Sequence, residues 1–112
     1  QPLIERLIDK STSGKLEWEP TANRQQFITS IGGNITFKIR IIETTDVNFI
    51  GEPDIVKVPK IEMFDEQGKL IWEEQGKNIN VKMLWELYEI ARRIGNNLDS
   101  RFSEAIEALD KL

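Results

Sequence analysis

The chain has 112 residues and a formal net charge of −4, with 39% hydrophobic and 30% charged residues, a balance typical of a globular protein with one hydrophobic core. It contains no cysteine and no histidine, which excludes disulfides, thiolate nucleophiles, Cys-based zinc sites and any mechanism that needs an imidazole base. The acidity is concentrated between residues 46 and 78, where four basic and eight acidic side chains give −4, so nucleic acid is a disfavoured partner and protein a favoured one.

The first forty residues predict a helix followed by strands. Apolar side chains share one helical face over residues 2–11, with Pro2 at a first-turn position where proline is tolerated. Residues 15–19 alternate apolar and polar side chains, and residues 25–31 begin a second extended segment after a polar turn. We therefore expect a short N-terminal helix and then a β-hairpin.

A second hairpin is predicted at Gly32-Gly33, because adjacent glycines supply the positive φ angles of a tight turn. The strand after it, residues 35–42, alternates strictly between apolar and polar side chains. One face of the sheet should therefore be buried and the other exposed to solvent. The buried face should carry Ile35, Phe37, Ile39 and Ile41.

Residues 43–53 read as a long polar connection, after which strand patterns return over residues 55–64 and 70–74. Pro59 interrupts the first of these strands and removes a ladder donor, which indicates a strand edge or a bulge. Taken together, the patterns along the chain predict an α+β fold. Its sheet is a five-stranded antiparallel β-meander, with a short N-terminal helix and a long C-terminal helix packed on one face. We expect one domain spanning residues 1–112.

The C-terminal third predicts one long helix over residues 81–111, since its apolar stripe keeps the same phase throughout. Such a helix would span ~46 Å, whereas a chain of this length has a radius of gyration of only ~13 Å. The helix should therefore overhang, break or meet a partner. The alternative to a single helix is a break at Gly95-Asn96-Asn97, because glycine and asparagine are poor helix formers.

The sequence offers no catalytic, cofactor-binding or metal-binding motif, and we predict no cofactor. Carboxylate pairs such as Glu73 with Glu74 and Asp65 with Glu66 are typical of solvated strand edges and turns, and they lack the ligand spacing of a calcium loop. Gly32-Gly33 lies between two strands, so it does not direct a helix N-terminus at a phosphate. The chain is predicted to be non-enzymatic.

The tryptophans and a group of basic residues can each be interpreted either as structural or as part of a binding surface. The three tryptophans, at positions 18, 72 and 85, suit either core packing or an exposed binding platform, and packing is the favoured interpretation because large aromatics bury ~150 to 250 Å² each. Arg92-Arg93, Lys82 and Arg101 form a modest basic patch, but interspersed acidic residues favour ordinary helical ion pairs.

Three segments together resemble a family of small uncharacterised bacterial proteins. They are Leu7–Trp18, with the sequence LIDKSTSGKLEW, then Gly68–Ile71, and finally LWELYEIARR from Leu84 to Arg93 with the following Leu98-Asp99. The resemblance implies a bacterial domain that covers most of the chain. It implies no activity, cofactor or functional residue.

These observations favour a protein-interaction or regulatory domain that acts through the C-terminal helix, as a homodimer or as an adaptor for another protein. The alternative is a small-ligand-binding domain that uses the acidic loop 43–54 and a cleft beside the sheet, with Asp46, Glu52 and Asp54 as polar contacts. No run of apolar residues reaches the ~20 needed to span a membrane, and we expect a cytoplasmic protein. The predicted interface residues are Leu84, Tyr88, Ala91, Leu98 and Phe102.

Overall fold

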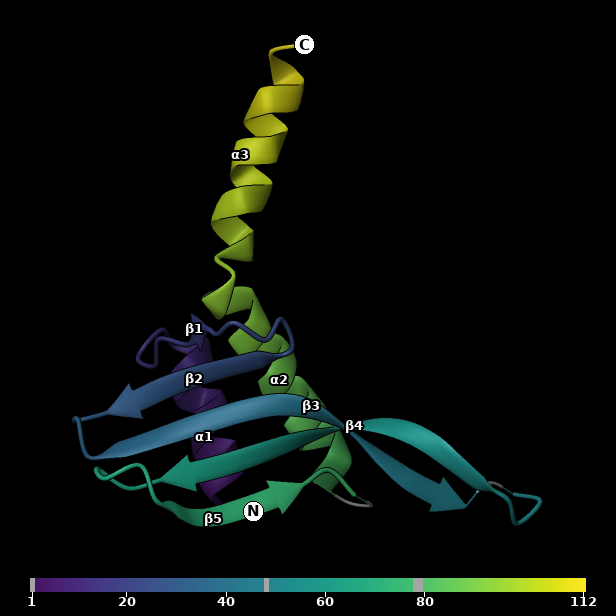
Figure 1. Cartoon of the computed structure of the whole chain (residues 1–112). Coiled ribbons are helices and arrows are strands. Elements are labelled where there is room, and N and C mark those ends of the chain that lie inside the picture. Colours follow the sequence, from purple (N-terminus) through teal and green to yellow (C-terminus); the bar gives the residue numbers. More distant parts are fainter. Residues whose placement is uncertain (1, 48, 78–79) are drawn as a thin grey trace.

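The computed structural model describes residues 2–47, 49–77 and 80–112. At its centre is one antiparallel sheet in which each strand pairs with its neighbour in the sequence, in the order β1-β2-β3-β4-β5 (Figure 1). The α+β class and the five-stranded antiparallel meander are confirmed. The strands are β1 (Glu19–Pro20), β2 (Gln26–Ile31), β3 (Ile35–Val47), β4 (Pro53–Phe64) and β5 (Leu70–Gln75).

Two of the three helices cover one face of the sheet. Figure 1 shows α1 (Pro2–Thr12) and α2 (Val81–Gly95) side by side behind the strands, whereas α3 (Leu98–Asp110) leads away from them. The core forms where α1 and α2 meet the sheet. Its buried side chains are Ile4, Leu7, Trp18, Phe27, Phe37, Ile39, Ile61, Leu84, Leu87, Tyr88 and Ala91.

The alternation of β3 separates the two faces of the sheet as predicted. Phe37 and Ile39 are buried under the helices, and Ile35 and Ile41 pack partly buried against the same core. On the opposite face, Arg40 Nε donates a 2.8 Å hydrogen bond to Glu62 Oε1 of β4. Period-two patterning therefore identified the buried face correctly.

The first strand is much shorter than predicted, since only Glu19 and Pro20 pair with β2. The preceding backbone caps α1 instead, because the N–H groups of Lys15 and Leu16 both donate to the carbonyl oxygen of Lys10, at 2.9 and 3.2 Å. These amides are thus occupied by the helix end and are not available for a strand ladder. Trp18 nevertheless lies in the core, as its alternation predicted.

The prediction of a loop over residues 43–53 was wrong. β3 and β4 pair without interruption from Thr36↔Phe64 outward to Val47↔Pro53, so residues 43–47 and Pro53 belong to strands, and Asn48 lies outside the described residues. The outer part of this hairpin, described over residues 43–47 and 49–58, extends beyond β2 and β5 and is called the arm here (Figure 1). Its threonine, valine and isoleucine side chains favour strand, and cross-strand pairing outweighs the polar residues among them.

Pro59 stands where the sheet narrows, so the predicted strand edge is confirmed. Its partner Ile41 donates its N–H toward β2, to the carbonyl of Gln25, so the backbone groups of Pro59 point away from β3. On that side the ladder of β5 ends at Gln75, and the Pro59 carbonyl accepts a 2.7 Å bond from the N–H of Gly76. Neither the pairing of β4 with β3 nor that with β5 therefore requires a backbone N–H at Pro59.

The prediction of one continuous helix over residues 81–111 was wrong, because the chain breaks between α2 and α3. Asn97 adopts the left-handed conformation, with φ 52° and ψ 43°, which asparagine tolerates better than most residues. Just before it, Gly95 lies so close to Phe27 that an added Cβ would be 2.6 Å from Phe27 Cδ1. The glycine thus permits close packing, and the asparagine turns the chain.

The arm and α3 give the molecule an extended shape. The radius of gyration is 16.5 Å, compared with the ~13 Å expected for a sphere-like chain of this length. Figure 1 shows that the two projections leave the body in different directions and that the C-terminal end of α3 is remote from the sheet. No helix in the described part of the chain is long and apolar enough to cross a membrane.

Candidate interaction surface on the C-terminal helix

Three of the five predicted interface residues lie inside the core. Leu84 and Ala91 have 0% and Tyr88 has 5% of their surface exposed. The Tyr88 ring meets Phe27 of β2 edge to face, with ring centroids 5.9 Å apart. These side chains are covered by the sheet of their own chain, which leaves them no surface to share with a partner.

Burial also affects the ionisation of Tyr88. Its pKa is raised above the ordinary value of 10.0, chiefly because burial disfavours the phenolate, while the nearby Arg92 opposes the shift and Glu89 adds to it. A phenol held neutral inside a core is a packing group. Nothing in its position directs it toward a reacting molecule.

The other two predicted residues, Leu98 and Phe102, lie on α3 beyond the break. Leu98 is half-buried, and every residue from 99 to 112 is exposed. Phe102 has 52%, Leu109 66% and Leu112 99% of its surface exposed. We call the following set the α3 stripe: Leu98, Phe102, Ala105 and Leu109, which recur in steps of four and three residues along one side of α3, and Leu112, which continues the same spacing just after the helix ends at Asp110.

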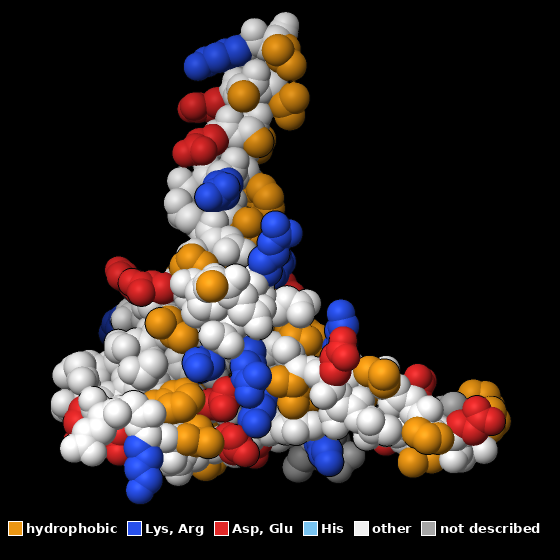
Figure 2. Space-filling view, in the orientation of Figure 1, with side chains coloured by type: hydrophobic (Ala, Val, Ile, Leu, Met, Phe, Trp, Pro, Cys, Tyr) orange, Lys and Arg blue, Asp and Glu red, His pale blue; other side chains and the backbone are white. Residues whose placement is uncertain are grey.

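The stripe faces away from the charged side of α3. Figure 2 shows apolar side chains along one flank of the projecting helix and acidic and basic side chains along the opposite flank. Ile106, with 60% of its surface exposed, lies beside the stripe and widens it. Sequence reasoning missed Ile106 because it followed only the strict stripe of three- and four-residue steps.

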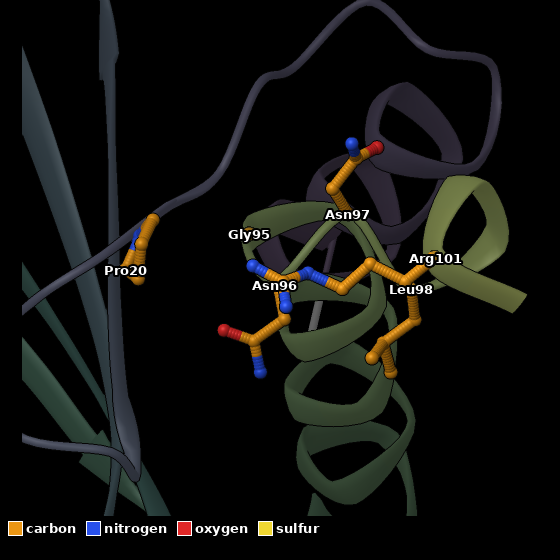
Figure 3. A pocket seen from close by; sticks show the side chains of 6 residues that line it. All are labelled: Pro20, Gly95, Asn96, Asn97, Leu98 and Arg101. Carbon is orange, nitrogen blue, oxygen red and sulfur yellow. The ribbon is translucent and has the colours of Figure 1, made fainter. Parts of the chain in front are cut away.

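A hollow of about 410 Å³ lies at the base of α3 (Figure 3). Its walls come from the end of β1, from the break between the helices and from the first turn of α3. Leu98 belongs both to this hollow and to the α3 stripe, so the two surfaces are continuous. The lining residues are Pro20, Gly95, Asn96, Asn97, Leu98 and Arg101.

The arm carries a second group of exposed apolar side chains. Val47, Phe49, Ile50 and Ile55 have 67%, 100%, 63% and 69% of their surface exposed. Four acidic residues and one lysine within residues 43–58 make the arm strongly acidic. The sequence did not single out these positions as a surface, because Val47, Phe49 and Ile50 fall in the predicted loop 43–53 and Ile55 begins a predicted strand.

The residues of the alternative ligand site are not brought together around one cavity. A hollow of about 480 Å³ where the arm meets the start of α2 is lined by Asp46, but Glu52 and Asp54 are absent from its described lining. Asp46 and Asp54 face each other across the strands. The other residues that line the 480 Å³ hollow are Thr44, Thr45, Val56, Val58, Gly76, Lys77 and Val81.

Three of the charged residues noted in the sequence, Arg92, Arg93 and Glu73, are engaged in ion pairs. Arg93 meets Asp99 at 2.7 Å, and Arg92 meets Glu89 at 2.8 Å, where the hydrogen bond raises the pKa of the arginine. Glu73 pairs with Lys60 at 3.2 Å. Within residues 2–47, 49–77 and 80–112, no three carboxylates gather as a metal site would require.

The tryptophans lie against the core, in line with the packing interpretation. Trp18 is 2% exposed, and its Nε1–H donates a 2.8 Å hydrogen bond to Ser11 Oγ. Trp72 and Trp85 are half-buried and pack against the core, with the Trp85 ring 6.0 Å from that of Tyr88.

Comparison of the chain with protein-family models, with curated proteins and with solved structures finds no significant match.

Proposed function

We propose that the chain is a non-enzymatic protein-interaction domain whose contact element is α3, acting either on a second copy of itself or on another protein. The observation that carries the proposal is an amphipathic helix of 13 residues that projects from the body with its apolar side in solvent. The body acts as a rigid base, because α2 is anchored in the core up to Gly95.

The energetics of short helices support a docking role. An isolated helix of fewer than about 12 to 15 residues is marginal in water, since most helical stability in proteins comes from packing an apolar face. Exposed apolar side chains that form a continuous stripe mark interaction sites, whereas single ones are common on any surface. Occupation of the stripe by a protein partner would supply the packing that α3 lacks within its own chain.

Site-specific photocrosslinking in the native host tests this proposal. A photoreactive phenylalanine analogue placed at Ile106, beside the stripe, should give a covalent protein adduct on irradiation. The same analogue at Ser100, which is exposed on the opposite side of α3, is the matched control and should give little or none. Absence of any protein adduct from position 106, in cells where the chain is folded and abundant, would contradict the proposal.

A further inference from the structure

We infer that α3 pairs with α3 of a second copy in antiparallel orientation, and that Leu112 of each copy enters the hollow at the base of the other. This inference rests on the proposed function and names its partner. The reason lies in the order of large and small side chains along the α3 stripe, which is complementary to itself when one helix is reversed.

The pairing matches side-chain sizes layer by layer. When two α3 helices run antiparallel with Leu98 level with Leu109 of the other copy, Phe102 lies level with Ala105. Each central layer then joins one large and one small side chain, as close packing of two helices requires. A parallel pair would instead bring Phe102 against Phe102 and Ala105 against Ala105, which crowds one layer and leaves a void in the next.

The same register directs Leu112 to the hollow. Leu112 lies just after the end of α3, where its N–H donates a 3.1 Å hydrogen bond to the Leu109 carbonyl. It therefore falls about one turn beyond Leu109, which is one turn before Leu98 of the other copy. That is the level of the 410 Å³ hollow between Pro20 and the break at Gly95-Asn96-Asn97, and Leu98 forms part of its wall (Figure 3). Leu112, which is 99% exposed in one chain, would thereby be covered.

The shape and charge of the molecule permit this arrangement. α3 leads straight away from the sheet (Figure 1), so an antiparallel pair places the two bodies at opposite ends of the helices, about 20 Å apart. Glu104, Glu107 and Asp110 are exposed and lie outside the stripe, and Figure 2 shows acidic side chains on the flank of the projecting helix opposite its apolar side chains. Pairing through the stripe therefore does not bury them against each other.

The interface is small, which sets the expected strength. Two helices of this length and two hollows bury less than about 1,200 Å², the range of weak or transient complexes. We expect dissociation on the order of micromolar or weaker. Light scattering of the purified full chain, from micromolar to millimolar concentration, should show the mass rising from 13.0 kDa toward twice that value. A monomer over the whole range would overturn the inference.

Disulfide trapping tests the orientation, since the chain has no cysteine of its own. Leu98→Cys and Leu109→Cys variants should form a disulfide-linked dimer when mixed under oxidising conditions, and neither should do so alone. In the antiparallel pair the two copies of position 98 are about 16 Å apart, too far for a bond. A disulfide from Leu98→Cys alone would indicate parallel helices and overturn the inference.

Leu98→Asp should abolish the rise in mass, and Leu112→Asp should weaken association at least tenfold because an aspartate would enter the hollow. Ser100→Asp adds the same charge on the opposite side of α3 and should leave the mass unchanged. Near-UV circular dichroism of the core tryptophans checks that each variant is folded. Unchanged association of a folded Leu98→Asp protein would contradict the pairing.

The two proposals fail in different ways. A monomeric purified chain whose position 106 crosslinks to a different protein in the host would overturn self-pairing and leave α3 a docking helix. A chain that is monomeric and gives no adduct would overturn both. A dimer that forms the mixed disulfide and crosslinks to its own copy supports both.

Discussion

The indole Nε1–H of Trp18 donates a 2.8 Å hydrogen bond to the hydroxyl of Ser11, and both residues are 2% exposed. The bond joins the last turn of α1 to the chain that enters the sheet. It satisfies two polar groups that the core would otherwise leave without a partner. The packing of α1 therefore depends on a serine as well as on its two leucines and two isoleucines.

Ser11→Ala should lower the free energy of unfolding by about 1–3 kcal/mol, because it leaves a buried indole N–H unsatisfied. Urea denaturation followed by tryptophan fluorescence measures the change. Ser13→Ala is the matched control, since Ser13 is exposed and bonds only locally to the Lys10 carbonyl, and it should cost about 0.5 kcal/mol or less. Equal losses for the two variants would show that the Trp18 bond contributes nothing.

Gly95→Ala should destabilise the protein although alanine is the better helix former. Helix propensity favours alanine by about 1 kcal/mol, whereas the added Cβ would lie 2.6 Å from Phe27 Cδ1, and overpacking of this kind costs about 1–3 kcal/mol. Thermal unfolding measures the net effect. In a Phe27→Leu background the clash is relieved, so the same substitution should be neutral or stabilising. A gain in the unaltered background would contradict the close approach.

Leu84→Ala and Leu109→Ala should change the free energy of unfolding by very different amounts, because the first side chain is buried in the core and the second is exposed on α3. Leu84 is 0% exposed, so its truncation should cost about 2–5 kcal/mol. Leu109 is 66% exposed and should change the stability of the isolated chain by about 0.5 kcal/mol or less. Urea denaturation at a concentration low enough for a monomer is the measurement. A large loss from Leu109→Ala in the monomer would mean that α3 packs on its own chain.

Stability should fall as the pH rises above about 10, in part through Tyr88. Burial raises the pKa of Tyr88 in the folded chain above its ordinary value of 10.0, so above that pH the unfolded chain loses the proton first. The folded chain then holds more protons, and a rise in pH favours unfolding. Tyr88→Phe should therefore show a smaller loss of stability between pH 9 and 11 in urea denaturation, compared with the unaltered chain. Identical pH profiles would contradict the raised pKa.

Local patterns predicted the sheet well because its central strands alternate between a buried and an exposed face. Phe37 and Ile39 are where period two places them, and Pro59 marks the strand edge it was expected to mark. The arm was predicted only over residues 55–58, because the strand residues between 43 and 53 are held by cross-strand partners, such as Thr45 opposite Ile55, and pairing between segments is not visible in either segment alone.

The candidate surface was predicted only in part. The apolar side chains keep one helical phase from Leu84 to Leu112. Which of them are buried depends on where the sheet ends, and the periodicity of a helix does not give that position. Leu84 lies over the sheet and is buried, whereas Phe102 lies beyond it and is 52% exposed. The break at Asn97 was the alternative left open by composition, and the contact of Gly95 with Phe27 is a tertiary feature that fixes its place.

The arm has a consequence for how the length of this fold can vary. Among the described residues beyond Pro59, β3 and β4 pair only with each other, and their ladder continues in register to Val47↔Pro53. Removing or adding two residues on each strand would preserve which side chains face which side, since strands repeat every two residues. The core would be untouched. In proteins that share this architecture, insertions and deletions should therefore accumulate at the end of this hairpin, in steps of four residues, while the distance from Pro59 to Gly76 stays fixed.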